Sequence, residues 1–156
     1  MSVDVGSKAP EFTLMNQDRQ PVRLSEQKGK PVLLAFFPAA FSGVCQKELC
    51  TFRDSMARLN KANAQVYGIS VDTFFALKAF ADAQGLTFPL LSDFNKETIR
   101  EYGVLNEDMI GLKGIAKRAV FVIDKEGVVR YKEVLDDARN EPNYDKVFAS
   151  LSSLQP

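Results

Sequence analysis

The sequence has no histidine, no tryptophan and only two cysteines among its 156 residues. Without histidine, the chain contains no Cys-His or Ser-His catalytic pair and no histidine-ligated metal or haem site. Two cysteines cannot supply the four thiolates of a structural zinc or iron–sulfur site within one chain. We therefore expect no metal and no cofactor, so cysteine, carboxylate, lysine, arginine, hydroxyl or tyrosine groups must carry any chemistry.

The chain also lacks net charge and long apolar segments. Lysine plus arginine and aspartate plus glutamate both total 20, so electrostatics gives no reason to expect binding to nucleic acid or to an anionic membrane. No apolar run approaches the ~20 residues that cross a bilayer, and the N-terminus shows no secretory signal. We expect a cytoplasmic protein, where two cysteines favour catalysis or packing over a structural disulfide.

What the sequence does contain is ordinary for a globular protein, with 46% hydrophobic and 26% charged residues. A chain of this length is typical of one domain, here residues 1–156, and buries roughly 70% of its unfolded surface without disulfides.

The alternation of apolar patterns predicts an α/β fold, with a mixed central sheet flanked by helices and an N-terminal β-hairpin in front. The apolar run 31–37 is typical of a strand covered on both faces. The predicted elements are strands at 9–14, 20–24, 31–37, 65–71, 88–91, 119–124 and 128–132, helices at 42–59, 74–84, 96–102 and 140–154, and a loop at 104–117.

The densest chemical signal lies at residues 36–45, with the sequence FFPAAFSGVC. A buried strand ends at Pro38, a short loop follows, and a helix begins near Gly43 with Cys45 in its first turn. Free backbone N–H groups and the positive end of the helix dipole favour a thiolate there. Equally, Ser42 could be a simple N-cap and Cys45 a small buried hydrophobic residue. The spacing alone leaves both interpretations open.

This segment resembles the active-site motif of the peroxiredoxins, thiol peroxidases of the alkyl hydroperoxide reductase/thiol-specific antioxidant superfamily. The motif is P-x-x-x-S-x-x-C, in which threonine is commoner than serine but the hydroxyl is retained. The resemblance covers about Val3 to Leu154 and is closest to the Q-type, or bacterioferritin comigratory protein-like, group, with the E-type as near neighbour. Four further segments carry it: VGSKAPEF at 5–12, YGISVD at 67–72, FPLLSD at 88–93 and RAVFVID at 118–124.

The resemblance implies a thioredoxin-like fold and reduction of hydrogen peroxide and organic hydroperoxides through a sulfenic acid on Cys45. Pro38 would shield the thiol, and the Ser42 hydroxyl would bind the thiolate and the peroxide. Arg118 matches the family's active-site arginine, since a permanent cation stabilises a thiolate and its donors can polarise the O–O bond. Without the resemblance, Arg118 would be interpreted as a solvated charge at a strand end, and Lys117 is an alternative cation.

Cys50 lies five residues after Cys45 on the predicted helix. Helix geometry places the two Cα atoms roughly 8–9 Å apart and the side chains about 140° apart, whereas a disulfide needs Cα atoms within about 7 Å. An intact helix therefore excludes the bridge, which requires the first turns to unfold. Q-type peroxiredoxins resemble this arrangement, which implies that Cys50 resolves the sulfenic acid as an intramolecular disulfide and that a thioredoxin-like dithiol reduces it.

Several alternatives stay open at this point. Cys50 could be a packed bystander, because E-type relatives lack it; the chain would then be a one-Cys peroxidase resolved by an external thiol. A peroxide sensor without turnover and an inert structural domain are further possibilities. Glu48 matches a glutamate that often follows the nucleophile in Q-like sequences, or it is a solvated helix charge. Phe41 and the pair Phe74-Phe75 belong to the core or to a dimerising edge, so monomer and homodimer both remain.

Overall fold

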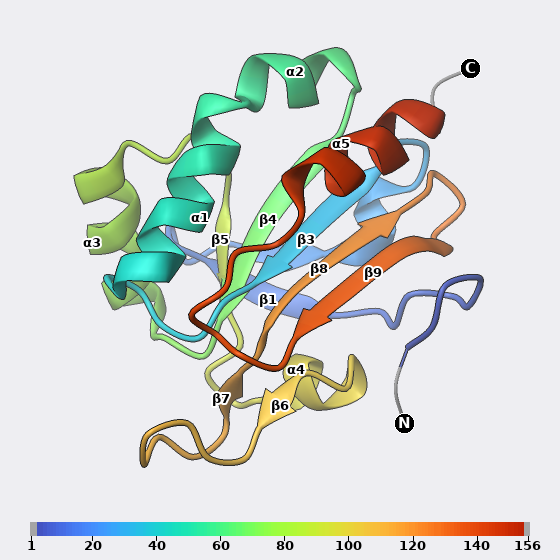
Figure 1. Cartoon of the computed structure of the whole chain (residues 1–156). Helices are drawn as coiled ribbons and strands as arrows, with labels where there is room; N and C mark the ends of the chain where they lie inside the picture. Colours follow the sequence, from blue (N-terminus) through green and yellow to red (C-terminus); the bar gives the residue numbers. More distant parts are fainter. Residues whose placement is uncertain (1–2, 155–156) are drawn as a thin grey trace.

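The structure is a computed structural model that describes residues 3–154; the outermost residues of the predicted domain, 1–2 and 155–156, lie outside the described residues (Figure 1). The strands are β1 (Thr13–Asn16), β2 (Pro21–Arg23), β3 (Val32–Phe36), β4 (Gln65–Ser70), β5 (Leu90–Ser92), β6 (Leu105–Asn106), β7 (Ile115–Ala116), β8 (Arg118–Ile123) and β9 (Val129–Leu135), and the helices are η1 (3-10, Leu24–Gln27), α1 (Gly43–Asp54), α2 (Met56–Lys61), α3 (Phe74–Gln84), α4 (Glu97–Glu101) and α5 (Tyr144–Ser153). After an N-terminal hairpin, strands and helical segments alternate as far as α4; strands β6 to β9 then follow one another before α5.

A mixed seven-stranded sheet in the order β2-β1-β5-β4-β3-β8-β9 forms the centre of the molecule. Strand β3 runs parallel to β4 and antiparallel to β8. The N-terminal hairpin β1–β2 joins the sheet because β1 pairs antiparallel with β5. The expected α/β class and mixed central sheet are therefore confirmed.

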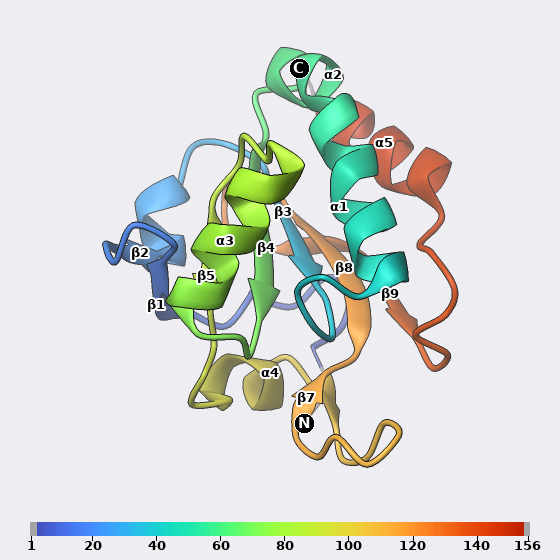
Figure 2. The ribbon, with the colours of Figure 1, turned by 90° about the vertical axis from the view of Figure 1, so that its left-hand side faces the viewer.

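The sheet separates two hydrophobic cores, and the alternating side chains of β3 contribute to both. Leu33 and Ala35 pack with buried residues of α1, α2, α3 and α5 on one face. Leu34 and Phe36 pack on the other face with α4 and the N-terminal segment. Figure 2 shows α1, α3 and α5 together on the first face. Because both faces are covered, every residue of β3 is buried, as the apolar run 31–37 predicts.

The predicted helix at 42–59 is wrong in its length, because the structure divides it into α1 and α2 at Ser55. The Ser55 hydroxyl donates to the Thr51 carbonyl at 2.9 Å, and the Thr51 hydroxyl donates to the Lys47 carbonyl at 2.8 Å. Hydroxyls that bond back to the preceding turn compete with the helical ladder and bend helices. The chain therefore changes direction after Asp54, although Leu59 is still buried.

Two other boundaries differ from the sequence prediction. The segment 104–117, expected to be a loop, contains the short antiparallel pair β6–β7. Helix α5 begins at Tyr144 with Asn143 as its N-cap, whose side chain accepts from the Lys146 backbone N–H. Pro142 thus precedes the cap instead of occupying the first turn. Within residues 3–154, no helix has both the length and the apolar character needed to cross a membrane.

Candidate active site

The antiparallel pairing of β3 and β8 brings the two ends of the candidate site together. Phe36, the last residue of β3, pairs with Ala119. The loop that leaves β3 leads into α1 and Cys45, while Arg118 is the first residue of β8. The nucleophile candidate and the arginine candidate therefore meet at one edge of the sheet, although they are 73 residues apart in the sequence.

Cys45 is a free thiol in the first turn of α1, and its exposed fraction is 0%. The Arg118 Nη2 atom donates a hydrogen bond to the Cys45 sulfur at 3.1 Å. Cys45 also belongs to the same core cluster as the apolar residues Phe37 and Leu49. The structure thus places a permanently charged donor in hydrogen-bond contact with the candidate nucleophile.

The Arg118 side chain is buried and fixed from several directions. Its Nη1 atom donates to Glu48 Oε1 at 2.9 Å, and Nε and Nη2 donate to the Ala138 carbonyl at 3.2 and 3.0 Å. Burial lowers the pKa of Arg118, but Glu48 and Cys45 raise it by more, so the pKa lies above its ordinary value. The interpretation of Arg118 as a solvated strand-end charge is therefore wrong.

Glu48 is fully buried, so its interpretation as a solvated helix charge is also wrong. Its Oε1 atom accepts from Arg118, while Oε2 has no hydrogen-bond partner among the described residues. Burial raises the pKa of Glu48, and the Arg118 guanidinium lowers it by less. The resulting pKa is about 7. The site thus holds one guanidinium between two acidic groups, Glu48 and Cys45, and near neutral pH the carboxyl group can be protonated or ionised.

Ser42 and Pro38 occupy the loop between β3 and α1. Ser42 is the backbone N-cap of α1, because its carbonyl accepts from Gln46 N–H at 2.9 Å, but its side chain makes no capping hydrogen bond. Within residues 3–154 there is also no hydrogen bond from the Ser42 hydroxyl to Cys45, a contact that the resemblance implied. Pro38 is buried, and Phe41 between them has a positive φ of 66°.

An open cavity of about 760 Å³ reaches the site from the surface. It touches Arg118 and the loop before Cys45, while the fully buried Cys45 is not among its lining residues. An oxidant that entered here would meet the guanidinium first. The lining residues are Pro38, Ser42, Gly43, Val44, Asn106, Asp108, Met109, Ile110, Arg118, Asp136, Asp137, Ala138 and Arg139.

Several of these residues were not identified from the sequence. Ala138 contributes only its backbone carbonyl, and Met109 and Ile110 lie on the segment joining β6 to β7. None of them has a side chain that signals chemistry in a linear pattern. Gly111 and Gly114 are typical of the loop predicted at 104–117, but they carry no information on its proximity to Cys45.

Cys50 lies on the same continuous helix as Cys45 and is also a free thiol. It is half-buried, and its sulfur donates to the Gln84 side-chain oxygen at 3.5 Å. In this structure α1 is intact from Gly43 to Asp54, the state in which helix geometry keeps the two sulfurs apart.

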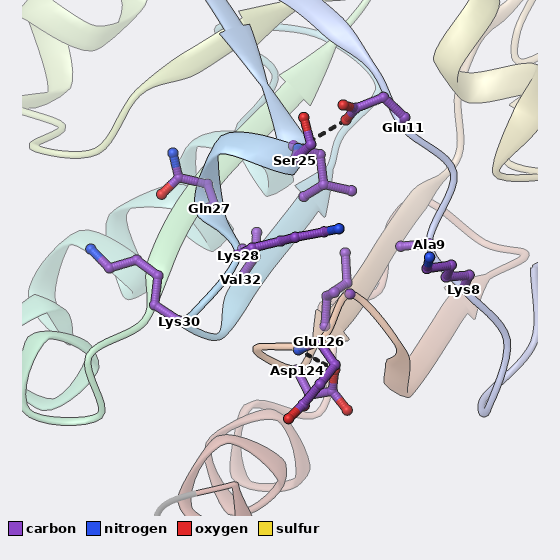
Figure 3. A pocket seen from close by; sticks show the side chains of 13 residues that line it. Lys8, Ala9, Glu11, Ser25, Gln27, Lys28, Lys30, Val32, Asp124 and Glu126 are labelled. Carbon is purple, nitrogen blue, oxygen red and sulfur yellow. Dashed lines mark hydrogen bonds between the residues drawn. The ribbon is translucent and has the colours of Figure 1, made fainter.

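A second cavity, of about 270 Å³, lies at the opposite end of the sheet (Figure 3). Val32 and Ile123, which pair at the far end of β3 and β8 from Cys45, line it. Its rim includes Lys8, Lys28 and Glu126. The lining contains no cysteine, so this cavity offers no nucleophile for a peroxide.

Comparison with known proteins agrees with this geometry. Residues 5–132 match the AhpC/TSA family. A chloroplastic peroxiredoxin Q from Triticum aestivum is 46% identical over 129 residues, which are 83% of this chain and 58% of that protein. Alkyl hydroperoxide reductase E from Mycobacterium bovis is 38% identical over 156 residues, covering 97% of this chain and 99% of that protein.

Solved structures show the same relationship. The crystal structure of peroxidoxin BcpB from Mycobacterium tuberculosis superposes with a TM-score of 0.89 at 31% identity and covers 99% of both chains. A peroxiredoxin-like protein from Aquifex aeolicus gives a TM-score of 0.91 at 32% identity, covering 99% of this chain and 90% of that one. The chain therefore belongs to the AhpC/TSA family and is a thioredoxin-fold peroxiredoxin, a peroxidase of the oxidoreductase class.

Proposed function

We propose that this chain reduces hydrogen peroxide and organic hydroperoxides through a sulfenic acid on Cys45. The observation that carries the proposal is the 3.1 Å hydrogen bond to the Cys45 sulfur from Arg118, which itself lines an open cavity. The thiolate attacks one peroxide oxygen, so an S–O bond forms and the O–O bond breaks. The other oxygen takes up a proton and leaves as water or alcohol, and the Arg118 donors stabilise the charge that develops on it.

Pro38 and Ser42 have supporting roles in this proposal. Both line the cavity beside Arg118, and Pro38 is buried at the point where β3 ends. Pro38 keeps water from the thiolate, and the Ser42 hydroxyl donates to the bound peroxide. The half-buried position of Ser42 is consistent with this role, because a hydroxyl without an intrahelical partner is free to turn towards a ligand.

Organic hydroperoxides suit the mouth of the cavity because part of its wall is apolar. Val44, Met109 and Ile110 line it, and the Ile110 side chain is 95% exposed. An alkyl group that covered these side chains would gain about 0.8 kcal/mol for each CH₂ removed from water.

Cys50 completes the cycle as the resolving residue. After α1 opens, its thiol condenses with the Cys45 sulfenic acid, and a disulfide and one water are formed. A thioredoxin-like dithiol then reduces the bridge, which requires a reducing compartment such as the cytoplasm. The presence of a second free thiol on the same helix supports this step. The alternatives are a one-Cys cycle that ends with an external thiol and a peroxide sensor without turnover.

An exposed apolar cluster favours a homodimer over a monomer. Phe75 is 66% exposed, Phe94 is 60% exposed and Met15 is 37% exposed. The three line one shallow hollow together with Phe74. Large exposed aromatic side chains that are grouped in this way mark interaction surfaces.

The test is a stopped-flow reaction of the reduced protein with hydrogen peroxide, followed by mass spectrometry. Rapid consumption that leaves a protein lighter by a pair of hydrogen atoms supports the full proposal. Rapid consumption that leaves added oxygen on Cys45 retains the peroxidase but removes Cys50 from the cycle. Cys45→Ser must abolish consumption, and Cys50→Ser must abolish thioredoxin-dependent turnover while the first oxidation persists. A wild-type protein that reacts as slowly as a free thiol would overturn the proposal.

A further inference from the structure

The end of α3 contacts α1 directly at Cys50. The Cys50 sulfur donates to Gln84 Oε1 at 3.5 Å, and Arg53 Nη1 donates to the backbone oxygen of the same Gln84. Both contacts join segments more than 30 residues apart, with sequence separations of 34 and 31. Figure 2 shows α1 and α3 on the same face of the sheet. We call Gln84 with its two contacts, Cys50 and Arg53, the latch.

The position of Gln84 explains why an arginine docks there. Gln84 is the last residue of α3, and Gly85 ends the helix in the left-handed conformation with φ 62°. The last carbonyl groups of a helix lack intrahelical donors and lie at the negative end of its dipole. The Arg53 guanidinium supplies a donor and a positive charge to the Gln84 carbonyl, while the Gln84 side chain is left to accept from Cys50.

The latch also keeps Cys50 away from Cys45. The Cys50 sulfur donates to Gln84 while α1 is intact, and an intact helix places the two cysteines too far apart for a disulfide. A latched Cys50 must therefore leave Gln84 before it can attack Cys45.

We infer that release of the latch sets the rate at which Cys50 resolves the Cys45 sulfenic acid, with Gln84 and Arg53 as positioning residues. The inference rests on the proposed function, in which Cys50 is the resolving thiol. The step that it controls is the condensation of Cys45–SOH with Cys50–SH. The S–S bond forms, the S–O bond breaks, and the hydroxyl leaves with the Cys50 proton as water. While the latch holds, the sulfenic acid stays exposed to a second peroxide and to sulfinic acid formation.

The test uses Gln84→Ala, which removes the acceptor, and Gln84→Glu, which restores one. Asp82→Ala is the matched control, because Asp82 lies on the same helix, is exposed and contacts Lys78 without touching α1. Stopped-flow mixing with hydrogen peroxide separates oxidation of Cys45 from the later formation of the disulfide. We expect Gln84→Ala to leave the first phase unchanged and to accelerate the second about two- to fivefold, the effect of losing one weak neutral hydrogen bond.

Two further measurements separate a latch from a general structural role. Hydrogen exchange should accelerate in residues 46–52 of Gln84→Ala but not in Asp82→Ala, and the sulfinic fraction at a fixed peroxide dose should fall. Gln84→Glu should return the rate of the second phase, the hydrogen exchange and the sulfinic fraction towards the wild-type values. If Gln84→Ala does not fold, Gln84→Asn, whose amide is one methylene shorter, tests the same contact.

The outcomes distinguish this inference from the proposed function. An unchanged or slower second phase in Gln84→Ala, with the disulfide still forming, overturns the latch and leaves the peroxidase cycle intact. Failure of the wild-type protein to form the Cys45–Cys50 disulfide overturns the proposed resolving step itself, and the latch with it. Equal acceleration in Asp82→Ala would show a general loosening of α3 and also overturn the latch.

Discussion

Arg118 donates a hydrogen bond to the Cys45 sulfur at 3.1 Å, and its other terminal nitrogen donates to Glu48 at 2.9 Å. One guanidinium therefore connects the candidate nucleophile to a buried carboxylate on the next turn of the same helix. Its position is fixed further by the Ala138 carbonyl. Any change that alters the orientation of this guanidinium should therefore alter the reactivity of the Cys45 sulfur.

Arg118→Lys should slow the reaction of Cys45 with hydrogen peroxide about 10²- to 10³-fold, the usual cost of losing a positioned donor at a reacting centre. Lysine keeps the charge but cannot contact Cys45, Glu48 and Ala138 with one planar group. The second-order rate constant from stopped-flow fluorescence or competition kinetics measures the effect. Lys117→Met is the matched control, since it removes the adjacent cation and should leave the rate unchanged. Similar losses in both variants would contradict a specific role for Arg118.

Glu48→Gln should flatten the pH dependence of stability. The folded pKa of Glu48 is about 7, above the ordinary value of 4.5, so the folded protein binds more protons than the unfolded chain between these values. The contribution of Glu48 to stability should therefore be largest below this window and decrease as the pH rises to about 7, by up to about 3 kcal/mol. Urea denaturation at pH 5 and pH 8 tests this. Parallel pH profiles for the two proteins would contradict it.

Ile110→Asp should discriminate between peroxides. The variant replaces an exposed apolar side chain at the mouth of the cavity with a charge, so cumene hydroperoxide should react about four- to fifteenfold more slowly, equivalent to one or two CH₂ groups returning to water. Hydrogen peroxide has no alkyl group and should react as before. Leu112→Asp is the control, because it is 50% exposed on the same connection but does not line the cavity. An equal effect on both peroxides would rule out an alkyl contact.

Phe75→Glu should convert a homodimer into a monomer. A charge placed in the apolar hollow formed with Phe94 and Met15 must be desolvated when two copies associate. Sedimentation velocity over a concentration series measures the mass. Val5→Glu provides a control at another exposed apolar residue, 58% exposed, that does not line this hollow. A wild-type protein that sediments as a monomer at all concentrations would eliminate the dimer.

Local sequence pattern predicted most of the fold. The run 31–37 is a fully buried strand, and the helix that begins at Gly43 places Cys45 in its first turn. Errors occurred where short-range competition by side chains altered a boundary, as at Ser55, where hydroxyl groups bond back to the preceding turn, and at Asn143, whose side chain caps α5 in place of an earlier start.

The sequence by itself was enough to predict Cys45 as the candidate nucleophile, because the strand–loop–helix pattern around Cys45 and the family motif depend on neighbouring residues. Only the tertiary structure decided that Arg118 and not Lys117 contacts the sulfur, that Glu48 is buried, and that Gln84 binds Cys50. The Arg118 contact depends on the register of β3 and β8, and the Gln84 contact depends on the packing of α3 against α1. The burial of Glu48 depends on which residues cover its face of α1. Hydrophobic periodicity is a property of one helix or strand at a time, and it does not indicate which distant element packs against the buried face.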